Sequence, residues 1–120
     1  PFFNWRNTMT LQQKLKQISD AFSALLPNTY HYWRPKMQPP FIVWQEDGEG
    51  DSLHTGNKKA EQSITGTLDY YTKQEFDPMV DSIQQTFQSL PCGWYLNQVA
   101  YEDETNLIHY EWVWEVAGIV

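Results

Sequence analysis

The side chains of this sequence best suited to act as a nucleophile, a base or a metal ligand are one cysteine and three histidines. Because Cys92 is the only cysteine, an internal disulfide is excluded and a reducing compartment is favoured. His31, His54 and His109 lie far apart along the chain, and no two of them have the spacing of a zinc-ligand pair. The sequence therefore predicts no metal site built from these side chains.

A second candidate for metal binding is the acidic run Asp47-Gly48-Glu49-Gly50-Asp51. It departs from the EF-hand pattern, because Ser52 stands where that loop needs glycine and Lys58 where it needs a bidentate glutamate. We interpret the run as part of a solvated polar loop. An irregular cation site is the alternative.

Catalysis by Cys92 needs a neighbouring base, and only the fold can bring His31 or His109 near it. Cys92 lies between Pro91 and Gly93, in a turn where a small packed thiol is the more common arrangement. The glycines of residues 48–56 lie in an acidic segment that is unsuited to binding phosphate. We therefore predict no catalytic residue and no cofactor, and we interpret the chain as a protein other than an enzyme.

The charge of the chain is distributed unevenly. Residues 1–73 contain all eight Lys and Arg together with seven Asp and Glu, whereas residues 74–120 contain eight Asp and Glu and no Lys or Arg. Binding to nucleic-acid phosphates needs cations, so the C-terminal part is unsuited to gripping DNA or RNA. It forms either a solvated acidic face or a surface that meets a basic partner or repels passing nucleic acid.

Two amphipathic helices are predicted. Thr10 and Gln13 form a capping-box pattern before an apolar stripe that ends at Pro27-Asn28. Asp77 followed by Pro78 begins the second helix, which Pro91 ends. Strands are predicted where apolar and polar residues alternate or where β-prone residues gather, at residues 29–33, 41–44, 63–71, 94–101 and 107–116.

These elements predict one α+β domain over residues 1–120, with the order α-β-β-β-α-β-β. We expect a mainly antiparallel sheet of about five strands, with both helices packed on one face. Residues 1–9 form an N-terminal arm, and residues 47–59 form a long polar loop.

The six tryptophans, seven tyrosines and six phenylalanines are numerous for a domain of this size. We expect some of them at the surface, where large aromatic side chains often mark interfaces. Trp5, Trp33 and Trp44 are the candidates, because they lie at a terminus, beside a turn and before the predicted loop.

One segment and its surroundings resemble a known protein family. The run Ile64-Thr-Gly-Thr-Leu-Asp-Tyr-Tyr-Thr-Lys73 is followed by Asp77-Pro78 and an amphipathic helix. A Tyr-rich strand, an Arg-Pro turn and a strand opened by prolines precede it, over Tyr30 to Trp44. From Thr10 to Val116, this arrangement is similar to the tail-terminator and head–tail-joining proteins of long-tailed bacteriophages and prophages.

The resemblance implies a structural virion protein at the head-proximal end of the tail, assembled in the cytoplasm of the host bacterium. Such proteins form homo-oligomeric rings, usually hexamers, that cap the tail-tube protein and dock with head completion or connector proteins. DNA passes through the ring as cargo without specific binding, and no membrane is involved. The resemblance implies that residues 47–59 match an extended loop that rearranges on docking.

The residues expected at interfaces combine the candidate tryptophans with charged residues of the predicted loop and the last strand: Trp5, Trp33, Trp44, Asp47, Glu49, Asp51, His54, Lys58, Glu111 and Glu115. Two alternatives stay open. One is another head–tail connector or tail-assembly adaptor. The other is a small-molecule-binding α+β domain or enzyme, with an aromatic-lined pocket to which His31 or Glu111 supplies polar groups.

Overall fold

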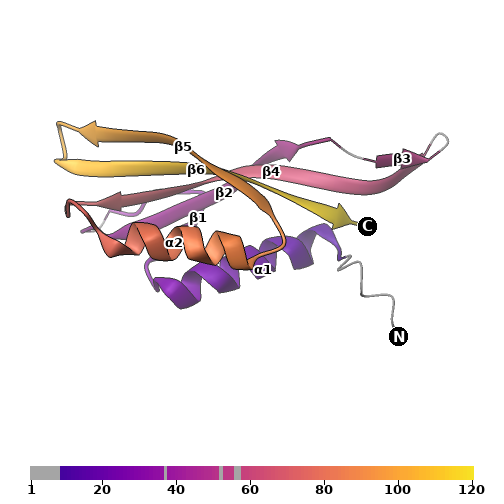
Figure 1. Cartoon of the computed structure of the whole chain (residues 1–120), viewed down its shortest axis with the longest axis horizontal. Helices are drawn as coiled ribbons and strands as arrows, with labels where there is room; N and C mark the ends of the chain where they lie inside the picture. The colour runs from indigo at the N-terminus through magenta and orange to yellow at the C-terminus, as the bar shows by residue number, and fades with distance from the viewer. Residues whose placement is uncertain (1–8, 37, 52, 56–57) are drawn as a thin grey trace.

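A computed structural model describes residues 9–36, 38–51, 53–55 and 58–120. Within these residues the chain forms two layers, a long twisted sheet and a pair of helices that lie together on one side of it (Figure 1). The elements are α1 (Leu11–Leu25), β1 (Thr29–His31), β2 (Phe41–Glu49), β3 (Leu53–Thr55), β4 (Lys58–Thr72), α2 (Pro78–Ser89), β5 (Gly93–Glu102) and β6 (Leu107–Ile119).

The main path of the sheet has the strand order β1-β2-β4-β6-β5, and the short β3 pairs with the first residues of β4. All pairings are antiparallel except β1 with β2, which is parallel. The predicted α+β class and the predicted order of the main elements are confirmed. The sequence did not indicate β3 or the parallel pair.

The prediction of a polar loop over residues 47–59 is wrong for much of that segment. β2 continues to Glu49, β3 follows, and β4 already begins at Lys58. We call this extension of β2, β3 and β4 the ribbon, and Figure 1 shows it projecting beyond the helices. Charged residues and glycine are uncommon in strands, so the sequence did not predict the end of β2 or β3. These segments form strands because they pair with β4 through backbone hydrogen bonds.

Both helices begin where the sequence predicts. The Thr10 hydroxyl accepts a hydrogen bond from the backbone N–H of Gln13, and the Gln13 side chain accepts one from the N–H of Thr10. At α2, the Asp77 carboxylate accepts hydrogen bonds from the N–H of Met79 and from the hydroxyls of Tyr70 and Thr72. Asp77 therefore ties the start of α2 to the end of β4.

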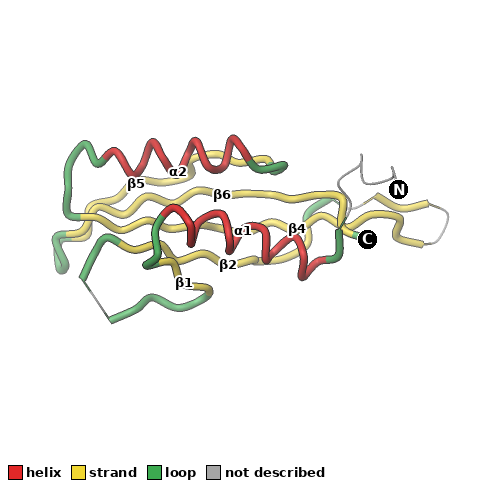
Figure 2. The backbone as a smooth tube through the Cα atoms, turned by 90° about the horizontal axis from the view of Figure 1, so that it is seen from below, coloured by secondary structure: helices red, strands yellow, loops and turns green. Residues whose placement is uncertain are grey.

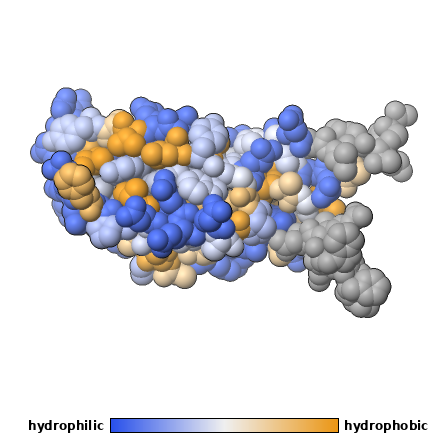
Figure 3. Space-filling model, in the orientation of Figure 1, coloured by the Kyte–Doolittle hydropathy of each residue, from blue (hydrophilic) through white to orange (hydrophobic). Residues whose placement is uncertain are grey.

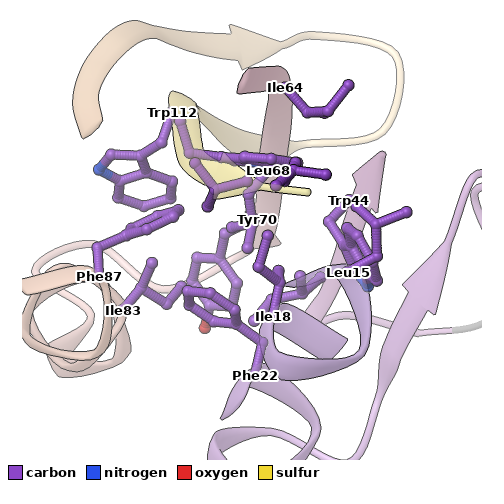
Figure 4. Packing of buried hydrophobic residues seen from close by; sticks show 14 residues of the cluster. Leu15, Ile18, Phe22, Trp44, Ile64, Leu68, Tyr70, Ile83, Phe87 and Trp112 are labelled. Atoms are coloured by element: carbon purple, nitrogen blue, oxygen red, sulfur yellow. The ribbon is translucent and has the colours of Figure 1, made fainter. Parts of the chain in front are cut away.

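The hydrophobic core lies between the helices and one face of the sheet. α1 lies over β2 and β4, and α2 lies over β5 and β6 (Figure 2). Phe22 of α1 and Phe87 of α2 meet with their ring centroids 4.8 Å apart, and the rings of Phe87 and Trp112 also face each other (Figure 4). Residues with alternate spacing along β4, among them Leu68 and Tyr70, complete the core.

Gly66 in the middle of β4 is required by close packing. A Cβ atom at this position would overlap with the indole of Trp114 on β6 and with the backbone carbonyl oxygen of Gln45 on β2. The Trp114 ring therefore lies directly over the β4 backbone, where it also contacts the ring of Trp44. Gly66 thus interrupts the apolar pattern of β4 because the Trp114 indole packs against the backbone at this position.

The other face of the sheet has a smaller cluster at one end, formed by Phe41, Val43, Tyr71 and Leu107. Arg34, which follows β1, stacks its guanidinium over the ring of Tyr71, with the Cζ atom 4.4 Å from the centroid. It also reaches the Glu102 carboxylate at 3.3 Å. Neither of the two described helices lies over the remainder of this face.

We predict that Gly66→Ala destabilises the fold by about 1–3 kcal/mol, because the added methyl group has no space under Trp114. Denaturant unfolding followed by tryptophan fluorescence measures the change. Gly93→Ala is the matched control, since nothing lies within 4 Å of its added Cβ. Equal losses in the two variants would contradict the packing role of Gly66.

We also predict that Asp77→Asn costs about 1–2 kcal/mol at neutral pH, through weaker hydrogen bonds at the helix start. Burial alone raises the pKa of Asp77, but the hydrogen bonds from Tyr70, Met79 and Thr72 outweigh it and lower the pKa below 3.8. A lowered carboxylate pKa stabilises the fold above the unfolded value, and this contribution disappears as the pH falls through the folded value.

The difference in unfolding free energy between wild type and Asp77→Asn should therefore be largest near neutral pH and shrink below about pH 4. Unfolding measured across this pH range tests the prediction. Asp81→Asn, in the exposed first turn of the same helix, is the control and should show little change. A difference that does not depend on pH would refute the role of the carboxylate charge.

Candidate functional site

We call the face of the sheet opposite the two described helices the open face. Its central side chains come from alternate positions of β4 and β6: Thr65, Thr67, Asp69, His109, Glu111, Val113 and Glu115. These residues alternate along β4 and β6 with the residues that point into the core. The same alternation that builds the core therefore also builds this surface.

Carboxylates dominate the chemistry of the open face. Asp69 and Glu111 lie directly opposite each other on β4 and β6. His109 Nε2 is 2.6 Å from an Asp69 oxygen, and the Asn97 amide donates to Glu111 at 2.8 Å. At the ribbon end, the Ser63 hydroxyl donates to Glu115 at 2.9 Å. Neighbouring polar groups thus hold the carboxylates in place.

Like charges directly opposite each other on neighbouring strands destabilise a sheet by a few tenths to about 1 kcal/mol. In the described part of β4 and β6, the side chains of the open face include no lysine or arginine that could relieve this repulsion. Arg34 lies at the end of the face, over Tyr71. The open face is therefore rich in carboxylates, of which Asp69 contacts His109 and Glu111 contacts Asn97.

A second candidate is a groove of about 1000 Å³ between α1 and the β1–β2 edge. Gln13, Lys16 and Gln17 of α1 line one side, and His31 and Glu46 line the other. The groove is wide and combines amide, ammonium, carboxylate and aromatic groups. Its composition suits a ligand that forms several hydrogen bonds.

The centre of the groove wall is an aromatic stack. The His31 ring lies between the rings of Tyr32 and Trp44, with centroid distances of 3.7 and 3.9 Å. Glu46 joins the stack, since one oxygen is 2.7 Å from His31 Nε2 and the other accepts the Tyr32 hydroxyl proton at 2.5 Å. A positive φ of 83° at Tyr32 turns its side chain into this position.

These hydrogen bonds change the ionisation of the groove. Burial raises the pKa of Glu46, but the hydrogen bonds from Tyr32 and His31 exceed this effect and lower the pKa overall. The same hydrogen bond to Glu46 raises the pKa of Tyr32 above 10. At neutral pH the groove therefore presents a carboxylate and a neutral phenol, which can bind polar groups of a ligand.

Among the tryptophans expected at the surface, Trp33 is exposed, with 66 % of its surface accessible, so that expectation is confirmed. The expectation for Trp44 is wrong, because only 2 % of its surface is accessible. Alternation along β2 turns Trp44 toward the helices together with Ile42, where it packs against Trp114. Trp5 lies outside the described residues.

The charged residues expected at interfaces do not form one site. Asp47, Glu49 and Asp51 are exposed at the base of the ribbon, where Glu49 pairs with Lys59 at 2.6 Å. The backbones of His54 and Lys58 belong to β3 and β4, and their side chains lie outside the described residues. Glu111 and Glu115, in contrast, share the open face.

Sequence reasoning missed the partners of the two described histidines. Glu46 joins His31, and Asp69 joins His109, across 15 and 40 residues of sequence. The period-two pattern of β4 already placed Asp69 on the polar face. Only the register between β4 and β6 brings it beside His109.

Cys92 is half-buried, and burial raises the pKa of its thiol to about 11. Its Sγ lies 3.7 Å from the Phe87 carbonyl oxygen, which accepts the weak thiol hydrogen bond. Over residues 9–36, 38–51, 53–55 and 58–120, no cluster of His, Cys, Asp and Glu suits a metal ion. In the same ranges, neither helix has the length and apolar character needed to cross a bilayer.

We predict that Glu111→Gln stabilises the fold by a few tenths to about 1 kcal/mol at low ionic strength, because it removes one of two opposing carboxylates. Salt screens the repulsion, so the gain should shrink at high salt. Denaturant unfolding at two salt concentrations measures it. Glu104→Gln, in the exposed β5–β6 turn, is the control, and an equal gain there would contradict a local origin.

No protein-family model matches the chain, and a search of curated proteins found no match.

Proposed function

We propose that this chain is a structural morphogenesis protein of a long-tailed bacteriophage or prophage. As a tail terminator, it forms a ring that caps the tail tube and joins it to the head. The resemblance over residues 10–116 supplies the protein class. The single observation that supports it in the structure is the group of carboxylates on the open face, where Asp69 and Glu111 lie opposite each other on β4 and β6.

An acidic surface suits the lining of a channel through which DNA moves. Duplex DNA carries about one negative charge per 1.7 Å of its axis, and a wall with lysine or arginine would retain it. Carboxylates repel phosphates over roughly 8 Å at physiological salt. A ring with the open face turned inward would therefore let DNA pass as cargo without binding it.

In this proposal the chain assembles with copies of itself, as a hexamer, and meets the tail-tube protein on one side and a head completion or connector protein on the other. The ribbon projects beyond the helices (Figure 1), and we propose that a neighbouring protein contacts it there. A two-stranded ribbon gains stability from such a contact, because two strands alone are marginal in water. The protein acts in the virion tail after assembly in the host cytoplasm.

The proposal assigns no reaction to the chain. The high pKa of Cys92 leaves it as a neutral thiol at physiological pH, which is a weak nucleophile. His31 contacts Glu46 on the helix side of the sheet, and His109 contacts Asp69 on the open face; both contacts join a histidine to a carboxylate. Function through contacts between proteins explains these features without a catalytic centre.

Coexpression with the tail-tube protein of the same phage or prophage tests the proposal. Electron microscopy should show tubes of limited length with a ring at one end, and tubes made without this chain should grow to variable lengths. The tube protein must be present, because the tube can be required for ring formation. Unlimited tubes without end rings would overturn the proposal, whereas a ring that binds only the connector would indicate another head–tail adaptor.

The groove favours a second candidate, a domain that binds a small molecule. Its supporting observation is the convergence of His31, Tyr32 and Glu46 on one wall. NMR mapping with a library of polar fragments tests it: fragments should shift groove resonances in the wild type but not in Glu46→Ala. Shifts that are scattered over the surface, or unchanged in the variant, would refute this candidate.

A further inference from the structure

β5 is an edge strand of the described sheet. It lies at the end of the strand order, and within the described residues β6 is the strand that pairs with it. In Figure 1 the arrowhead end of β5 runs along the upper margin of the molecule, with β6 below it and both helices at the lower margin. Every second residue of an edge strand directs its N–H and C=O groups outward, so β5 offers hydrogen bonds to another chain.

The second half of β5 is the part best suited to accept a further strand. A register shift between Leu96 and Gln98 interrupts the pairing with β6, and residues 98–102 then pair regularly with residues 107–111. These five residues extend for about 17 Å, which is an ordinary strand length. Lysine and proline commonly protect an edge strand, and β5 contains neither.

One side of residues 98–102 is apolar. Val99 and Tyr101 pair with Tyr110 and Ile108 of β6, and 51 % and 59 % of their own surfaces are accessible. Apolar residues also gather at this end of the molecule in Figure 3, which has the orientation of Figure 1. Opposed residues on neighbouring strands lie about 5 Å apart, so apolar side chains of an added strand would cover Val99 and Tyr101.

The other side of residues 98–102 lies beside a carboxylate. Gln98 is opposite Glu111, which accepts a hydrogen bond from the Asn97 amide, a neutral donor that adds no positive charge. Adjacent strands lie about 4.8 Å apart, so a strand added outside β5 lies about 10 Å from β6. The combined length of an arginine or lysine on that strand and of Glu111 spans this distance along the open face.

The surroundings of Glu111 favour a cationic partner. Residues 74–120, which form α2, β5 and β6, contain eight Asp and Glu and no Lys or Arg. Within the described residues, Arg34 contacts Glu102 at the end of β5, whereas Glu111 contacts Asn97. A partner that supplies lysine or arginine beside Gln98 would therefore complement the charge of this edge.

We propose that residues 98–102 of β5 bind an extended segment of a partner protein, in which apolar residues alternate with lysine or arginine. The segment adds to the sheet as a further strand, so that its backbone bonds to β5, its apolar side chains cover Val99 and Tyr101, and its cations reach Glu111. A second β5 is a poorer occupant, because residues 74–120 contain no Lys or Arg to meet Glu111. This contact is independent of the proposed function.

A peptide of about eight residues that alternates arginine and valine tests the inference, because it is long enough to pair with residues 98–102. Fluorescence anisotropy at physiological salt should show that it binds the wild-type chain. Hydrogen exchange followed by NMR should slow about tenfold or more at outward amides of residues 98–102 when the peptide is bound. Peptides with glutamate in place of arginine, or with N-methylated valines, should bind about tenfold more weakly or less.

Two variants with matched controls locate the contact. Val99→Lys should weaken peptide binding about tenfold, because it replaces an apolar contact with a like charge. Val120→Lys is its control, since 67 % of Val120 is accessible at the C-terminus, at the other end of the molecule in Figure 1. Glu111→Gln should weaken binding about threefold, and Glu75→Gln, in the exposed turn before α2, should not. Denaturant unfolding confirms that each variant is folded.

Several results would overturn the inference. Binding that leaves exchange at residues 98–102 unchanged would show a contact through charge alone. Equal binding of the N-methylated or the glutamate peptide would exclude strand addition or a basic partner, respectively. Dimerisation of the chain alone that protects the same amides would assign the edge to a second copy. Each measurement uses the chain without tail-tube protein, so these failures are distinct from a failure to cap tubes.

Discussion

The contact on which the rest of the fold depends is the Trp114 indole over the backbone of Gly66. It lets β6 place a large ring directly over the middle of β4, where any side chain would prevent the approach. Trp44 of β2 then reaches the same ring from the other side. β2, β4 and β6 thus meet in one close contact, and residues of α1 and α2 belong to the same core cluster (Figure 4). A smaller residue at position 114 would leave a cavity, and a larger one at position 66 would separate the strands.

Both helices lie on one side of the sheet, and the other side has a smaller hydrophobic cluster at one end. Beyond that cluster, Asp69 of β4 and Glu111 of β6 face each other. Hydrogen bonds from His109 and Asn97 reduce the cost of this arrangement but do not remove the two carboxyl groups. Carboxylates gathered on one face of the sheet are consistent with the proposed passage of a polyanion past that face.

Features that depend on neighbouring residues in the sequence were predicted correctly. Caps at Thr10 and Asp77 located both helices, and alternation assigned the two faces of β4 and β6. The features that were missed depend on pairing between distant segments: the ribbon, the parallel β1–β2 pair, and the carboxylates beside His31 and His109. Trp44 shows the limit most clearly, because its position before a polar segment suggested exposure. The continuation of β2 through that segment, which only its pairing with β4 stabilises, keeps Trp44 in the core.

The structure places the uneven charge of the sequence at particular elements of the fold, because the cation-free residues 74–120 form α2, β5 and β6. A net charge of −7 spread over the whole surface would serve solubility alone. Here the strand order moves the cation-free part to one edge, and that edge is also the long, apolar and unprotected β5. Solubility alone would favour lysine or proline on such a strand. Their absence leaves β5 as an exposed apolar edge of the described sheet, at the end of the molecule that holds no lysine or arginine.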